Sequence, residues 1–186
     1  MDAQIRSRTS KQMLYVSIIS MIMMFAGLTS AYVISSNRDD WISFELPQAL
    51  YISTLLIILS SISYLFAKKE IQKENRLQTT IFLIITLLLA LGFVFFQIEG
   101  FHQLREAGLY FTGEGSVVSS SLLVVISFAH LIHVAAGITV LLVVIFNHLN
   151  HKYKTNDTLG IELGGIFWHF VDILWIFLFL FFYFIT

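Results

Sequence analysis

The residues best suited to chemistry lie near the C-terminus of this 186-residue chain, in the stretch GIELGGIFWHFVDILWIFLFLFFY from Gly160 to Tyr183. Glu162, His169 and Asp172 follow the three-and-four spacing that places side chains on one face of an α-helix. The rest of the stretch is apolar enough to lie in lipid, where ionisable groups are costly. We therefore expect these three side chains to face protein.

Two histidines in the preceding apolar run form a second candidate group. His130 and His133, in HLIHVAAG, are three residues apart and share a helix face. If the two segments cross a membrane in opposite directions, His130 and Asp172 lie at similar depths, so a contact between histidine and carboxylate is possible.

Three kinds of chemistry fit these five residues. A structural lock would pair histidine with carboxylate and fix how the helices pack. A proton-handling site would use a histidine that titrates near neutral pH. A haem site would need two histidines facing one pocket, such as His130 or His133 with His169. His148 and His151 lie beside Lys152, where we expect them to be solvated.

The composition excludes several classes of protein. Hydrophobic residues make up 57% of the chain and charged residues 12%, about half the charged share of a soluble domain. The absence of cysteine excludes disulfides, thiolate catalysis and iron-sulfur clusters held by cysteine. A net charge of -1 offers no basic surface for nucleic acid.

Long runs free of charged residues predict an all-α bundle of five transmembrane helices in one domain, residues 1–186. About 20 apolar residues cross a hydrocarbon core of about 30 Å. The fifth run contains Glu162 and Asp172 and still reads as a span. The predicted helices are 12–36, 47–67, 77–99, 117–147 and 161–185.

The basic residues predict the orientation of the bundle, because short cytoplasmic loops are enriched in lysine and arginine. Nine of the eleven lysines and arginines fall on one side, leaving Arg38 and Arg105 on the other. The N-terminus is therefore expected to be cytoplasmic and the C-terminus periplasmic. The first run is too long for a signal peptide and is expected to remain as a span.

Two motifs in this order resemble subunit III of the haem-copper oxidases, chiefly cytochrome c oxidase. WHFVDILWIFLF, from Trp168 to Phe179, resembles the last helix of that family, and Gly160 to Glu162 resembles its Gly-Phe-Glu entry. HLIHVAAG resembles the family's His-Gly-x-His-Val-x-x-Gly pattern on the helix before it. The similarity extends over nearly the whole chain.

The resemblance implies an accessory subunit of a bacterial terminal oxidase in the inner membrane, in a short five-helix form of a family that commonly has seven. It implies that haem and copper belong to the catalytic subunit I and other partners, and that this chain binds no redox cofactor. It also implies bound structural phospholipid and support for proton uptake. The residues expected to form a structural or proton-linked network are Glu162, His169, Asp172, His130 and His133.

One residue departs from the family pattern. Met21 follows Ser20 where the family typically carries a membrane-buried glutamate.

A subunit III-like partner of a quinol oxidase or of nitric oxide reductase remains an alternative, because the sites for electron donor and acceptor lie on other subunits. Two alternatives come from other classes of protein: an independent b-type membrane cytochrome and a small transporter. The sequence shows none of the repeats or broken helices that are typical of transporters.

Overall fold

The computed structural model describes residues 3–111, 117–151, 153 and 158–185. Each of its five helices is long and apolar enough to cross a membrane, which confirms the predicted all-α fold class. The helices are α1 Ala3–Ser35, α2 Gln48–Gln72, α3 Arg76–Glu106, α4 Val118–Leu149 and α5 Leu159–Ile185.

Three helices extend well beyond the spans expected from hydropathy. α1 begins at Ala3 and so includes basic residues before the first apolar run, α2 continues to Gln72, and α3 continues to Glu106. None of these extensions contains proline, so nothing in the sequence interrupts the helical hydrogen bonds. Hydropathy marks the part of a helix that suits hydrocarbon, and these helices continue past it.

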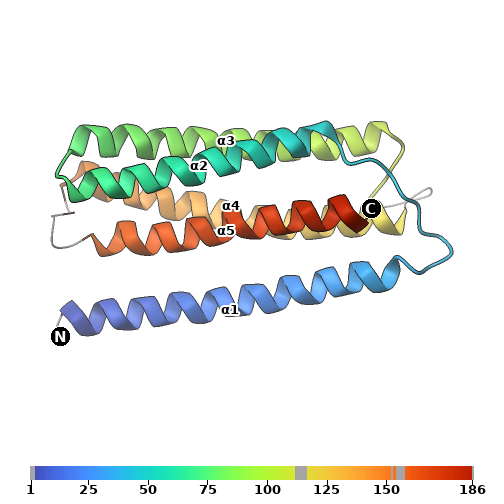
Figure 1. The fold of residues 1–186 in the computed structure, drawn as a ribbon, viewed down its shortest axis with the longest axis horizontal. Coiled ribbons are helices and arrows are strands. Elements are labelled where there is room, and N and C mark those ends of the chain that lie inside the picture. The colour runs from blue at the N-terminus through green and yellow to red at the C-terminus, as the bar shows by residue number, and fades with distance from the viewer. Residues whose placement is uncertain (1–2, 112–116, 152, 154–157, 186) are drawn as a thin grey trace.

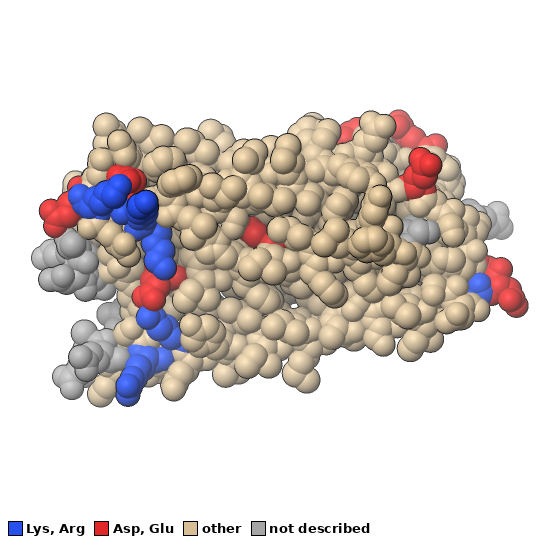
Figure 2. All heavy atoms as spheres, in the orientation of Figure 1, with Lys and Arg blue, Asp and Glu red and all other residues tan. Residues whose placement is uncertain are grey.

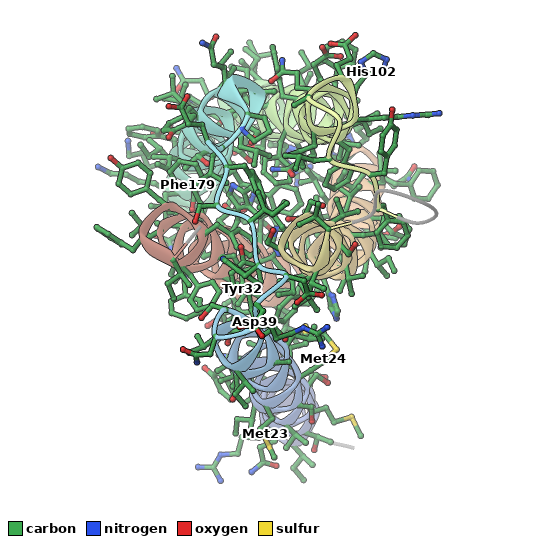
Figure 3. The ribbon with its side chains drawn as sticks, turned by 90° about the vertical axis from the view of Figure 1, so that its right-hand side faces the viewer. Met23, Met24, Tyr32, Asp39, His102 and Phe179 are labelled. Carbon is green, nitrogen blue, oxygen red and sulfur yellow. The ribbon has the colours of Figure 1, made fainter. Side chains whose placement is uncertain are left out.

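Four helices form a compact group, and α1 lies to one side of it (Figure 1). α2 packs on α3, and α5 packs on α2 and α4, whereas α1 contacts α4 and α5. The view along the bundle shows Tyr32 where α1 meets the group and Met23 on the far side of α1 (Figure 3). Tyr32 is buried and Met23 is exposed.

The two ends of the bundle differ in charge. The termini lie at opposite ends (Figure 1), and most lysine and arginine side chains gather at the end that holds the N-terminus (Figure 2). At the other end Arg38 forms a two-pronged ion pair with Asp40, with both distances 2.8 Å. The basic end agrees with the sequence pattern, and its assignment to the cytoplasm stays a prediction.

The interior contains two hydrophobic clusters, each with a tryptophan of α5 at its centre. Trp175 packs with Phe25, Phe93 and Phe182, whereas Trp168 packs in the second cluster with Tyr64. α5 therefore contributes the largest side chains to both clusters, and this sets the rotation of its polar residues.

Candidate functional site

The polar residues of α5 meet α2, and we refer to this contact as the α2–α5 seam. Hydroxyl groups of α2 supply a partner at four levels along the helix, and small hydroxyl-bearing residues are common interhelical partners in membranes. The four pairs are Trp175 Nε1 donating to Thr54 Oγ1 (3.0 Å), Trp168 Nε1 donating to Ser60 Oγ (3.0 Å), His169 Nδ1 with Ser61 Oγ (2.6 Å) and Tyr64 OH donating to the Ile161 carbonyl (3.0 Å).

Two adjacent glycines allow this close approach. A Cβ added to Gly164 would lie 2.8 Å from the Tyr64 hydroxyl oxygen, and one added to Gly165 would lie 2.9 Å from the Tyr64 ring. Gly164 also faces Val144 of α4, at 3.2 Å from such a Cβ. The glycines thus let the tyrosine ring pack directly against the backbone of α5.

Asp172 is the most isolated charged group in the seam. Its side chain is 1% exposed, and neither carboxyl oxygen has a hydrogen-bond partner among the described residues. The Ser61 hydroxyl, already bonded to His169, also lies near this carboxyl. The structure therefore brings His169 and Asp172 together around one serine of α2.

Glu162 has a different partner and a different environment. Its Oε1 lies 2.8 Å from Lys11 Nζ of α1, and the two side chains are 36% and 32% exposed. Glu162 and Lys11 lie at the basic end of the bundle, near the start of α5 and of α1. Glu162 shares the helix face of His169, yet it pairs with α1 and takes no part in the hydrogen bonds of the seam.

The histidines of α4 do not bond to the carboxylates of α5. The His130 ring is fully buried among Trp175, Phe93 and Phe25, with centroid distances of 5.1, 6.0 and 6.3 Å, and neither of its nitrogens has a partner in the described chain. His133 Nδ1 lies 2.7 Å from the Ala129 carbonyl of its own helix. His130 does contact α5, but at the Trp175 ring, which occupies the contact that the sequence suggested for histidine and carboxylate.

The arrangement does not provide a pocket shared by two histidines. His169 bonds to α2, whereas His130 lies in its aromatic surroundings, and neither lines the two cavities considered below. Within the described ranges, no three histidine, aspartate or glutamate side chains come together as metal ligands would.

His148 differs from its expected solvated state. It is buried, and its Nε2 lies 3.1 Å from Thr80 Oγ1 and 3.3 Å from the Arg76 carbonyl oxygen of α3. His148 therefore links α4 to α3 at the basic end. The expectation of a solvated His148 rested on the nearby Lys152 in the sequence, which gives no information about α3, the helix that covers His148.

Sequence reasoning missed the partners of α5 on α2. Thr54, Ser61, Tyr64 and Lys68 follow helical spacing, with Ser60 beside them. Such a row of hydroxyl groups in an apolar span is a usable signal for a helix contact. Reading this row as a counterpart to the tryptophans and histidine of α5 would have predicted the seam.

Comparison with known proteins identifies the family of the chain. Residues 7–186 match the family described as cytochrome c oxidase subunit III. The chain belongs to this family. It is 34% identical over 139 residues to "Cytochrome c oxidase subunit 3" of Drosophila melanogaster. The matched residues make up 75% of this chain and 51% of that protein.

Other subunit III relatives show the same level of similarity. The protein of that name from Spodoptera frugiperda is 32% identical over 137 residues, covering 74% of this chain and 87% of the relative. The lamprey Petromyzon marinus protein is also 32% identical over 137 residues, covering 74% and 49%. The chain spans about half the length of most of the curated relatives it matches.

Proposed function

We propose that this chain is the accessory subunit III of a haem-copper terminal oxidase and supports the assembly and stability of the catalytic subunit I. The observation that carries the proposal is the family match over residues 7–186. The α2–α5 seam supports an accessory role, because its four polar pairs are bonds between helices and leave those groups no cofactor to hold.

In this proposal haem and copper are bound by partner subunits and this chain carries no redox cofactor. The surroundings of the histidines support this part. His169 is engaged by Ser61, and His133 Nδ1 by the carbonyl of its own helix. His130 has free nitrogens, but rings of Phe25, Phe93 and Trp175 surround it, so a haem plane would have to displace them.

We further propose that the chain lies in a bacterial inner membrane with its basic end in the cytoplasm. The clustering of lysine and arginine at that end supports this orientation (Figure 2). Lys11, Lys68, Lys69, Lys73 and Arg76 all belong to helix ends on that side.

A phospholipid is the proposed occupant of an apolar groove between α1 and α5. The groove has a volume of about 570 Å³ and is lined by residues such as Ile22, Ala26, Phe170, Ile173 and Phe177. The lining offers almost no polar group that could bond a polar ligand, so an apolar acyl chain suits the groove.

Affinity purification from the native membrane tests the proposed function. An oxidase subunit III is expected to bring with it a much larger subunit that contains haem and copper, with haem absorbance proportional to that partner. A purified single chain with its own stoichiometric haem would overturn the proposal. The identity of the partner would also decide between a cytochrome c oxidase, a quinol oxidase and a nitric oxide reductase.

A further inference from the structure

Asp172 is a buried carboxyl group without a counter-charge bonded to it. Both oxygens lack a hydrogen-bond partner among the described residues, and the residue lies about midway along α5. A bare carboxylate in such a place is strongly unfavourable, and binding a proton removes the charge. The neutral acid can also donate to a nearby oxygen, which an ionised carboxylate cannot do.

One route of polar groups leads toward Asp172 from the basic end. A polar cavity of about 210 Å³ lies there, lined by residues including Lys68, Gln72, Thr158 and Glu162. Lys68 lines this cavity and lies on α2, about two helical turns from Ser61 and on the same face. The next link is the short contact between His169 Nδ1 and Ser61 Oγ, and Ser61 lies near Asp172.

His169 has the two nitrogens that a relay requires. Nδ1 contacts Ser61, whereas Nε2 is buried and has no hydrogen-bond partner among the described residues, so its lone pair can receive a proton. His169 is only partly buried, in contrast to His130, which is fully enclosed. A histidine so placed can accept a proton at one nitrogen and donate from the other.

We infer that Asp172 is a proton-exchange site in the middle of the bundle, reached from the basic end through His169 and Ser61. A proton binds His169 Nε2, the Nδ1 proton passes to Ser61 Oγ, and the former hydroxyl proton of Ser61 passes to an Asp172 oxygen. One N–H bond of His169 forms and another breaks, the O–H bond of Ser61 is replaced by another, and a new O–H bond forms on the Asp172 carboxylate, which becomes neutral. The reverse sequence returns the proton.

The other titratable groups on the helices packed against α5 are less suited to this role. α2 contributes Tyr64, whose hydroxyl donates to the Ile161 carbonyl, in addition to Lys68. α4 contributes His133, bonded to its own helix, and the enclosed His130. α1 contributes Lys11, which is paired with Glu162 of α5.

The inference goes beyond the proposed accessory role, and only the biological use of the site rests on that role. Infrared spectroscopy of the full chain, purified with whatever subunits accompany it, tests the site itself. A protonated Asp172 is expected to give a carboxylic C=O band that is lost in Asp172→Asn. The band should shift when wild-type aspartate carries carbon-13 in its side-chain carboxyl, which assigns it to an aspartate even if Asp172→Asn does not assemble; Asp39 and Asp40 are exposed, in contrast to the buried Asp172.

Transfer into deuterated buffer then tests the route. Ser61→Ala and His169→Gln should keep the band and slow its deuterium shift by roughly a hundredfold to ten-thousandfold, the range expected for loss of a positioned proton-transfer group. Ser60→Ala is the matched control, because Ser60 is the adjacent serine and bonds to Trp168 instead. His130→Gln is the control for loss of a buried imidazole.

Each alternative outcome would overturn the inference. Absence of the band in wild type means that Asp172 is ionised. A band that does not shift in deuterated buffer means that the proton is fixed. Equal rates in Ser61→Ala, His169→Gln and Ser60→Ala mean that exchange takes another route. None of these readouts requires catalytic activity of the subunits that co-purify, and each variant is compared with wild type in the same complex.

Discussion

The contact of α5 with α2 and its contact with α1 are built in opposite ways. On α2, four polar pairs follow one another along the seam, and glycines bring the helices close. On α1, one ion pair lies at the basic end and the Tyr32 ring packs on Phe181 and Phe182 near the other end. Between these two contacts, an apolar groove separates α1 from α5.

This contrast shows how helices can be held together when lipid is the solvent. Lipid chains are as apolar as the helices, so close packing and interhelical hydrogen bonds drive association. In its most apolar stretch α1 is 22% buried, against 44% for α2 and for α5. The seam therefore behaves as the fixed contact of α5, and the α1 contact leaves space for a lipid or a partner.

Filling the seam should have the largest effect. Gly164→Leu would place side-chain atoms where Tyr64 and Val144 already lie, and overpacking of this kind costs about 1–3 kcal/mol or more. We expect a large fall in thermal stability and in the yield of folded chain, measured after detergent extraction. Gly27→Leu on α1 is the control, because a Cβ there meets nothing within 4 Å; equal losses in both variants would contradict the comparison.

Removing a single seam bond should have an intermediate effect. The Trp168 and Ser60 pair can be isolated by a double-mutant cycle with Trp168→Phe and Ser60→Ala. Interhelical hydrogen bonds in membranes average about 0.6 kcal/mol of coupling, and we expect a value of that order in the free energy of unfolding. A coupling free energy of zero would show that packing alone holds the seam.

Breaking the ion pair with α1 should have the smallest effect. Lys11 and Glu162 are about one-third exposed, and exposed pairs contribute about 0–1 kcal/mol. Lys11→Met should change stability by less than the seam variants do, and its effect should shrink at high salt. Lys69→Met serves as the control, since Lys69 makes no ion pair within the described chain; a loss from Lys11→Met as large as that from Gly164→Leu would reverse the order proposed.

The fold could be predicted because hydropathy and length act locally. The runs between Lys11 and Arg38 and between Arg76 and Glu99 identify spans without knowledge of any neighbour. The ends of the helices were less predictable. The helical conformation of residues 3–10 depends on backbone hydrogen bonds and not on hydrophobicity.

The site was only partly predictable because spacing gives a helix face but not the helix that it meets. The stripe of Glu162, His169 and Asp172 is present, and His169 and Asp172 do share surroundings. The choice of α2 over α4 as their neighbour depends on the bulk of Trp175, which packs on His130. Glu162 pairs with α1 because Lys11 is at the same end of the bundle.

The seam also restricts how α5 can turn about its own axis. Its four bonds come from side chains and backbone of α5 that find their partners at one rotational setting. With 3.6 residues per turn, a shift of one residue rotates the helix by about 100°, which would break all four bonds at once. Asp172 forms no bond of its own, yet its direction is set by the tryptophans on either side of it.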